Sequence, residues 1–368
     1  MKFERKTLSD LGIVVTGKTP STKNSQFWDG EIPFVTPKDI QSTKHIFQTE
    51  RNITEQGLMN VKGSTLPAGS ICVSCIGNIG YVGITIKRCV SNQQINSIIV
   101  NKANDRDFVY YIIKNLWTFF KSYEGQSTAL SILNKTQFSK IQVDVPSLNE
   151  QRQIAGILSR IDDKIELNNA INNNLQQQAF TIFDEQFPSY NDGVMIIGDY
   201  ISPKRGKNLL FKDAVLGEVP VVAGGLEAAT YHNVANTVAP VLTISASGAN
   251  AGFVNLWHTP VWASDSSFID SAMTKDVFFW FVLLKKRQRE IFDSQTGSAQ
   301  PHIYPQHIAA MRIPTFDKEK IAAYVEQVQP LFTLIGANIR ENACLAILRD
   351  TLLPKLMSGE IDVSDIEI

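Results

Sequence analysis

Cysteine, histidine and long apolar runs are scarce in this chain. Four cysteines among 368 residues cannot form a disulfide framework, and we expect a cytoplasmic protein. The longest apolar run, residues 277–284, is much too short to cross a bilayer, and the polar residues 1–10 do not form a signal peptide, so no membrane association is expected. The motifs G-x-S-x-G, H-E-x-x-H and G-x-G-x-x-G are missing, which argues against a catalytic centre within the chain.

Two motifs that could bind a ligand are present, and both are better explained as strands. Residues 12–19 fit the phosphate-loop pattern, yet the loop positions hold Ile-Val-Val, which favour a strand, and Pro20 stands where a helix should begin. Cys72 and Cys75 form a C-x-x-C, but side chains three positions apart in a strand point to opposite faces, and no second pair follows. We therefore predict neither a nucleotide site nor a metal site.

Charge is unevenly distributed, although the total is only −1. The net charges of successive segments are +6 for residues 1–149, −3 for 150–187, 0 for 188–316 and −4 for 317–368. Such a division suits globular parts that touch phosphate and helices that touch something else. Ordinary scatter of charge is the alternative.

An internal repeat with an offset of about 170 residues organises the sequence. Each half contains a Gly-Lys pair, a strand–turn–strand segment, a strand interrupted by polar residues, an aromatic helix, a loop of small polar residues and a short strand that ends in proline. In that order, the matching segments are 17–18 and 206–207, 71–84 and 241–256, 89–98 and 261–271, 107–123 and 276–292, 125–133 and 296–303, and 143–146 and 311–314.

A long heptad-patterned helix is predicted after each globular part. Ser147 and Glu150 form a capping box at the start of the first. The seam positions are Ile154, Leu158, Ile161, Ile165, Asn168, Asn172, Leu175, Ala179 and Ile182 in the first helix, and Ile321, Val325, Val328, Phe332, Ile335, Ile339, Asn342 and Ala346 in the second. Helices of about 35 residues reach about 50 Å, so we expect an antiparallel spacer. Asn168 and Asn172 would fix its register if buried; the alternative is that they face solvent.

These patterns predict an α/β (α+β) fold with two similar globular domains separated by a two-helix spacer. The predicted parts are a first globular domain (1–146), a first long helix (147–187), a second globular domain (188–314), a second long helix (315–358) and a C-terminal tail (359–368).

Two similar globular domains on a stiff spacer could contact two separate patches of a long ligand, and duplex DNA is such a ligand. The candidate phosphate contacts are Lys18, Lys38, Lys204, Arg205 and Lys207. The candidate base readers are Asn78, Asn92, Gln93 and Gln94 in the first half, and Asn250, Ser264, Asp265, Gln300 and His302 in the second. For each residue the alternative is a turn or strand-end role, in which the backbone satisfies its polar group.

Several stretches together resemble the specificity subunits of type I restriction–modification systems. They are "GKTP" (17–20), "IPFVTPKDI" (32–40), "VPSLNEQRQIAGILSRIDDKIE" (145–166), "TGSAQPHI" (296–303) and "LRDTLLPKLMSGEI" (348–361). The resemblance extends over essentially the whole chain, and the stretch that enters the first long helix is its most specific part.

The resemblance implies a non-catalytic subunit with two target recognition domains, each of which reads one half of a split DNA site. The helices would set the spacing and dock two methylation subunits. The residues assigned to these partner and spacer helices are Gln151, Ile154, Leu158, Ile161, Ile165, Ile321, Val325, Val328, Phe332 and Ile335. S-adenosylmethionine, ATP and magnesium would belong to the methylation and restriction subunits, with no cofactor in this chain. The alternatives are a two-headed protein scaffold, or a methyltransferase or nuclease with an unrecognised active site.

Overall fold

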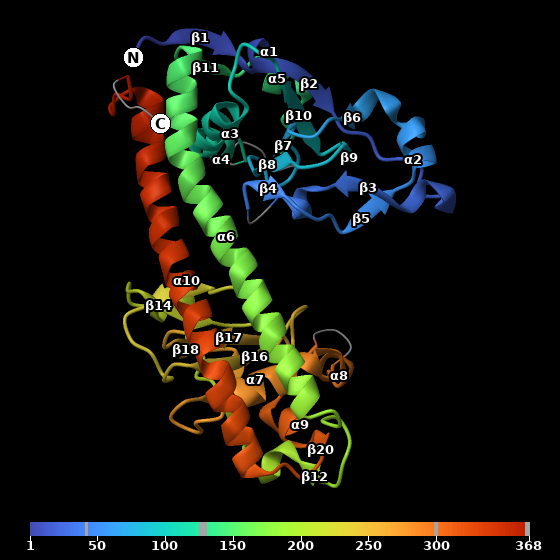
Figure 1. Cartoon of the computed structure of the whole chain (residues 1–368), viewed down its shortest axis with the longest axis vertical. Coiled ribbons are helices and arrows are strands. Elements are labelled where there is room, and N and C mark those ends of the chain that lie inside the picture. Colours follow the sequence, from blue (N-terminus) through green and yellow to red (C-terminus); the bar gives the residue numbers. More distant parts are fainter. Residues whose placement is uncertain (41–42, 125–130, 298–300, 365–368) are drawn as a thin grey trace. The chain divides into compact units, whose positions relative to one another are not determined.

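The computed structural model describes residues 1–40, 43–124, 131–297 and 301–364. Contacts divide the chain into two compact units, Met1–Asn168 with Glu341–Ile368 (unit 1) and Asn169–Arg340 (unit 2). Helices α6 (Leu148–Gln186) and α10 (Lys318–Ser358) each contribute residues to both units (Figure 1). The predicted division into separate domains and helices at residues 146, 187, 314 and 358 stays a prediction.

Unit 1 is a mixed helix and sheet structure with three sheets. Their strand orders are β2-β10-β7-β8-β4, β5-β3-β9-β6 and β1-β11. The strands are β1 (Glu4–Thr7), β2 (Gly12–Thr16), β3 (Trp28–Val35), β4 (His45–Ile46), β5 (Arg51–Ile53), β6 (Thr65–Leu66), β7 (Ile71–Ser74), β8 (Val82–Thr85), β9 (Cys89–Ser91), β10 (Ile95–Val100) and β11 (Gln142–Val145). The shorter helices are α1 (Leu8–Leu11), α2 (Glu55–Asn60), α3 (Arg106–Asn115), α4 (Trp117–Glu124) and α5 (Lys135–Ser139).

Unit 2 repeats this arrangement with fewer strands. Its sheets have the orders β13-β19-β16-β17, β15-β14-β18 and β12-β20. The strands are β12 (Met195–Ile196), β13 (Lys204–Arg205), β14 (Val219–Val222), β15 (Thr230–His232), β16 (Val241–Ser245), β17 (Val254–Trp257), β18 (Trp262–Ala263), β19 (Ser266–Asp270) and β20 (Arg312–Ile313). The shorter helices are α7 (Val277–Lys286), α8 (Gln288–Asp293) and α9 (Pro305–Ala309).

The predicted internal repeat and mixed fold are confirmed strand by strand. The order β2-β10-β7-β8 in unit 1 corresponds to β13-β19-β16-β17 in unit 2, and β5-β3-β9 corresponds to β15-β14-β18. Even the sense of pairing matches, because β3 pairs with β9 and β14 pairs with β18 in parallel, while the neighbouring pairs are antiparallel.

The single aromatic helix predicted in each half is instead two consecutive helices. In unit 1 the helix is interrupted at Leu116, between α3 and α4. In unit 2 it is interrupted at Arg287, between α7 and α8. Both breaks let the second helix approach a hairpin glycine. A side chain at Gly80 would come within 2.8 Å of Phe120, and one at Gly252 within 2.9 Å of Ile291. Close packing on these glycines redirects the helix, and no sequence pattern predicts that contact.

Within each unit, the segments of α6 and α10 pack antiparallel. In unit 1, Asn168 is 1% exposed and donates hydrogen bonds to Glu341 (2.7 Å) and Asn342 (2.8 Å). In unit 2, Asn338 donates to Asn172 (2.8 Å). Asn168 therefore does not face solvent, and these polar pairs select one register, because any slip would leave a buried amide unpaired.

The heptad seam packs on the globular parts as well as on the partner helix. Ile154 and Leu158 are fully buried in the core of unit 1 together with α3. In unit 2, Phe332 of α10 stacks on Phe278 of α7, with ring centroids 4.6 Å apart. The seam prediction is wrong at Ile339, which is 48% exposed, because a straight helix drifts away from a 3.5-residue repeat.

By length and composition alone, α10 could cross a membrane. Its apolar positions Ile321, Val328 and Phe332 are nevertheless buried in the core of unit 2. Burial in the core of unit 2 accounts for only part of this helix's apolar composition, because 22% of its most apolar window is buried.

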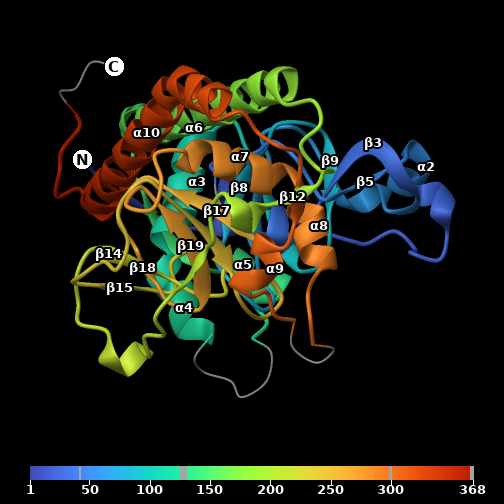
Figure 2. The ribbon, with the colours of Figure 1, turned by 90° about the horizontal axis from the view of Figure 1, so that it is seen from below.

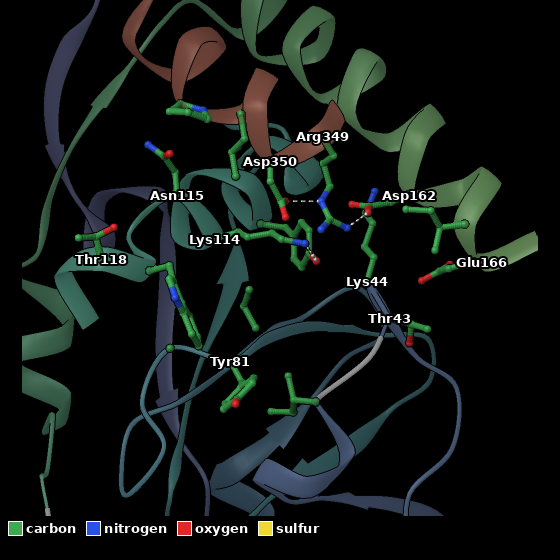
Figure 3. Close-up of a pocket in the computed structure, with 18 residues that line it drawn as sticks. Thr43, Lys44, Tyr81, Lys114, Asn115, Thr118, Asp162, Glu166, Arg349 and Asp350 are labelled. Carbon is green, nitrogen blue, oxygen red and sulfur yellow. Dashed lines mark hydrogen bonds and ion pairs between the residues drawn. The ribbon is translucent and has the colours of Figure 1, made fainter. Parts of the chain in front are cut away.

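Polar contacts in unit 1 join the long helices to each other, to α3 and to β4 with the residue before it; Figure 3 shows the Arg349–Asp162 pair. The Arg349 guanidinium of α10 pairs with Asp162 of α6 at 2.7 Å, and Asp162 also accepts from the Tyr111 hydroxyl at 2.7 Å. Lys44, which is 4% exposed, pairs with Asp107 at 2.6 Å and donates to Ser159 of α6 at 2.7 Å. Glu166 of α6 accepts from the backbone N–H of His45 and contacts Nδ1 of its ring, both at 2.8 Å.

Replacing Arg349 by Leu should destabilise unit 1 by roughly 3 kcal/mol, since it leaves the buried Asp162 carboxylate without its cation. The D162N/R349L double variant should lose less than the sum of the two single variants. Urea denaturation of the full chain measures both effects. The control is K164L, because the Lys164–Glu341 pair also joins α6 to α10 but is about half exposed, and its loss should cost less than about 1 kcal/mol. Equal losses for R349L and K164L would contradict this account.

His258 of unit 2 should make the stability of that unit depend on pH. Burial, with a smaller contribution from Arg340, lowers the pKa of His258 from 6.5 to about 4. Between pH 6.5 and pH 4 the unfolded chain therefore binds more protons at His258 than the folded chain does. The free energy of unfolding is highest above pH 6.5 as far as this group is concerned, and it decreases as the pH falls toward 4. Urea titrations from pH 7 to 4 should show a flatter dependence for H258Q than for the unsubstituted chain; identical slopes would disprove the assignment.

Candidate nucleic-acid interface

In unit 1, loops from four strand ends meet at one edge of the sheets. The N–H of Gly17 donates to the Ile95 carbonyl (3.0 Å), that of Asn92 to Val35 (2.9 Å), and that of Cys75 to Gln94 (2.7 Å). These bonds bring together residues 17–19, 36–39, 75–78 and 92–94, which we call the first loop cluster. The four loops come from strands β2, β3, β7 and β9.

The first loop cluster separates its polar side chains into inward and outward groups. Asn92 is 8% exposed and donates its Nδ2 to Gln94 Oε1 at 2.9 Å, while its Oδ1 accepts from the Gln94 N–H at 3.0 Å. Asn92 thus makes its hydrogen bonds within the loop, which agrees with the alternative that it has a turn or strand-end role. Gln93 is exposed and its Oε1 accepts from Thr19 at 2.6 Å.

The remaining candidates of unit 1 point to solvent. Lys18 and Asn78 are exposed in their loops. Lys38 is also exposed, and its ammonium lies 3.7 Å from a Glu50 carboxylate oxygen. Such an exposed pair is weak, so the lysine can exchange Glu50 for a phosphate at little cost.

Unit 2 builds a second loop cluster from the corresponding backbone bonds. The N–H of Gly206 donates to Ser266 (2.8 Å), that of Ser264 to Val222 (2.8 Å), and that of Ala246 to Asp265 (3.1 Å). The second loop cluster consists of residues 205–209, 246–250, 263–265 and 301–303.

The side chains of the second loop cluster differ from those of the first. Asp265 accepts from Arg205 at 2.6 Å and also receives a short hydrogen bond from the Ser247 hydroxyl. Ser264 is 3% exposed, and its Oγ accepts from the Leu209 N–H at 3.0 Å, so it has a structural role. The His302 ring stacks on Tyr304 with centroids 6.0 Å apart.

The other candidates of unit 2 lie around this centre. Lys204 and Lys207 are exposed on β13 and just after it, and Asn250 is partly exposed in the hairpin turn between β16 and β17. Gln300 lies outside the described residues. All described candidates of unit 2 except Lys204 thus fall within the second loop cluster.

The phosphate-loop match is a strand, as predicted. Residues Gly12–Thr16 form β2, and a side chain at Gly17 would come within 2.1 Å of the Asn92 carbonyl oxygen. The turn at Gly17 is therefore packed against protein backbone, and the described residues 17–24 that follow β2 form no helix whose N-terminus could face a phosphate. Burial raises the pKa of Cys72 to about 12 and that of Cys75 to about 11.

A possible cation-binding group in unit 1 has no counterpart in the sequence analysis. His45, Asp163 and Glu166 place ligand atoms within 4.8 Å of one another. The His45–Glu166 hydrogen bonds already explain why these two residues meet, because they hold β4 against α6. The third residue, Asp163, is exposed on the next turn of the helix.

A cavity of about 550 Å³ lies among α3, α4, α6 and α10 in unit 1 (Figure 3). Tyr81, Lys114 and Trp117 line it, together with the Asp162–Arg349 pair. Lys114 donates to the Tyr110 hydroxyl at 3.4 Å, and burial lowers its pKa. The charges of this cavity serve mainly to join helices, and its wall includes Gly80 and Tyr81 of the hairpin whose tip, Asn78, belongs to the first loop cluster.

Sequence reasoning identified the loops but missed these anchoring contacts. Gln151, predicted to act on the spacer or a partner subunit, is 2% exposed and accepts from the Asp105 N–H at 2.9 Å within its own unit. Its amide also donates to the Pro146 carbonyl at 3.0 Å. The sequence did hold a clue to the Asp162–Arg349 pair, because both residues lie in the stretches that carry the family resemblance.

Comparisons with known proteins agree on one family. A family model described as the type I restriction modification DNA specificity domain matches residues 1–177. The specificity subunit of the MjaIX type I restriction enzyme of Methanocaldococcus jannaschii is 28% identical over 99% of this chain and 94% of that protein. The HindI specificity subunit of Haemophilus influenzae is 39% identical over 39% of this chain and 32% of that protein.

A solved structure shares the fold. The crystal structure of a type I restriction–modification S subunit from M. genitalium has a TM-score of 0.59 and 16% identity, and covers 97% of this chain and 96% of that one. This likeness concerns the fold alone. The sequence matches carry more weight: residues 1–177 match the model of the type I restriction–modification DNA specificity domain, and both sequence relatives named above are specificity subunits of type I restriction enzymes.

Proposed function

We propose that this chain is a non-catalytic DNA-recognition subunit that acts in the cytoplasm, and that each loop cluster reads one half of a bipartite target. The observation that carries the proposal is that the two clusters share their backbone hydrogen bonds but present different side chains. Cys75 N–H to Gln94 O corresponds to Ala246 N–H to Asp265 O, and Leu133 N–H to Cys75 O corresponds to Ile303 N–H to Ala246 O. One scaffold with two sets of side chains suits two different half-sites.

The chemistry of the loops fits duplex DNA. Lys18 and Lys207 follow corresponding glycines and are exposed, as expected for phosphate contacts that position each reader. The exposed Gln93 offers an amide group that can pair with adenine, whereas Asp265, which already accepts from Arg205 and Ser247, keeps further lone pairs that can accept from cytosine. The two readers should therefore differ in the bases they select.

Methylation subunits are the proposed partners of the long helices, with restriction subunits joining them. Apolar side chains on α10 remain exposed in both units, at Leu334 (46%) and Ile339 (48%) in unit 2 and at Ile347 (69%) and Leu348 (47%) in unit 1. Unpaired apolar positions on a long helix suit a partner helix. S-adenosylmethionine, ATP and magnesium would be bound by these partners.

The alternatives are separated by two measurements. Methyl transfer from labelled S-adenosylmethionine by the chain without partners would support an enzyme in place of a recognition subunit. A complex with methylation subunits that protects no DNA in a footprint would support a protein scaffold. The proposed function requires two short protected patches and no activity of the chain alone.

Replacing Lys18 or Lys207 by Ala should weaken DNA binding by the assembled complex on the order of three- to tenfold at low salt. Each substitution should also lower the slope of log affinity against log salt by about 1 and leave the order of sequence preference unchanged. Matched controls are K102A and K275A, because these exposed lysines lie beyond the opposite ends of β10 and β19. Equal losses for the controls would mean that the loop clusters are not the DNA-contacting surface.

Deleting seven residues from each helix, 168–174 and 336–342, removes the Asn168–Asn342 and Asn172–Asn338 pairs together. The register of the remaining heptads is then held by the packing of α6 and α10 on the globular core of each unit. Methylome sequencing of a host with the shortened chain should show the same two half-sites with a changed gap. Altered half-site sequences at an unchanged gap would refute the division of labour between loops and helices.

A further inference from the structure

Unit 2 exposes four large apolar side chains within one short segment next to the second loop cluster. The exposed fractions are 50% for Leu210, 81% for Phe211, 56% for Val215 and 92% for Leu216. Single exposed apolar residues are ordinary, but a group of this size in seven consecutive residues indicates a surface that another molecule covers.

This segment is an ordered turn, and a hydrogen bond fixes each of its two ends. The Leu209 N–H donates to the Ser264 hydroxyl at 3.0 Å, which ties the start of the turn to the second loop cluster. The Val215 N–H donates to Nδ1 of His232 at 3.0 Å, which ties its end to β15. Between them, Phe211–Asp213 form a 3-10 turn, seen as the short yellow-green coil near β14 and β15 in Figure 2. The fold therefore presents Phe211 outward from a fixed base.

The surroundings of the turn favour a polyanion as the covering molecule. Lys207 and Lys212 are exposed on either side of Phe211, and Lys204 is exposed on the strand that leads into the segment. In such a group the lysines can contact the phosphates of a nucleic acid, and the aromatic ring can stack on its bases.

Unit 1 offers an internal comparison. The segment between β2 and β3 occupies the same place in the fold as the one between β13 and β14, because both follow the Gly-Lys pair and precede the strand with a parallel partner. Its exposed positions are polar, at Lys18, Ser21, Thr22, Lys23, Ser25 and Gln26. The apolar turn is thus a property of the second reader and not of the shared scaffold.

We propose that Phe211 inserts as a wedge between two base pairs at the second half-site, with Leu210 beside it and Lys207 and Lys212 on the flanking phosphates. This proposal rests on the proposed function of the second loop cluster. Insertion unstacks one base step, and steps that unstack easily cost less, so the wedge adds sequence selectivity at a position where no hydrogen bond is made. The first half-site has no such distortion.

The test uses the complex of the full chain with its methylation subunits and duplexes carrying the target that footprinting defines. 2-Aminopurine, whose fluorescence rises on unstacking, replaces one adenine at a time in and beside each half-site. At one position of the second half-site, the unsubstituted complex should give a several-fold increase that F211A abolishes and F211W retains. A base extruded for methylation brightens equally in both complexes, so the difference between F211A and the unsubstituted chain is the readout.

Affinity gives a second, independent readout. F211A should weaken binding about tenfold, which corresponds to the loss of one buried aromatic contact partly offset by the unstacking that is no longer needed. The matched control is V194A, because Val194 is 88% exposed in the same unit but precedes β12, outside the second loop cluster. V194A should bind DNA like the unsubstituted chain.

The outcomes separate the wedge from the function on which it rests. If F211A binds DNA with unchanged affinity and unchanged fluorescence, the wedge is overturned while DNA reading stands. If F211A instead prevents assembly with methylation subunits in the absence of DNA, the turn is a protein-docking surface and the wedge is equally overturned. If the unsubstituted complex protects no DNA at all, the proposed function itself fails.

Discussion

Cys75 and Gln94 in unit 1, and Ala246 and Asp265 in unit 2, are joined by one backbone hydrogen bond at the same place in the fold. This bond holds the hairpin turn against the loop that follows the interrupted strand. Since it uses only backbone atoms, its strength hardly depends on the side chains at either position. The loops can therefore carry different side chains while their positions are kept.

The long helices are held by a different kind of constraint. Hydrogen bonds of one buried asparagine in each unit fix their register, from Asn168 to Glu341 and Asn342 in unit 1 and from Asn338 to Asn172 in unit 2. An apolar seam alone would tolerate a slip of one heptad at modest cost, whereas an unpaired buried amide would not. These residues therefore fix the pairing of α6 with α10 inside each unit.

The stretches that most resemble the family have an unexpected role in the structure. Gln151, Asp162 and Glu166 of the first helix and Arg349 of the second are largely engaged in contacts within unit 1. Their contacts join the long helices to each other, to the start and the body of α3, and to β4. Residues that hold a scaffold are constrained by several partners at once, while exposed loop residues such as Gln93 have few partners and are free to vary.

Hydrophobic periodicity, turn residues and the internal repeat were enough to predict the two similar globular halves, the two long helices and the loops that carry the candidate site. These features are local or periodic, and the sequence by itself determines them. Only the tertiary structure decided which candidates point outward: Gln93 is exposed but Asn92 and Ser264 are buried, although all belong to similar polar stretches. Tertiary packing likewise determines where the aromatic helices are interrupted, at Leu116 and Arg287. Close packing on a distant glycine and hydrogen bonds between loops far apart in sequence depend on contacts that no local pattern records.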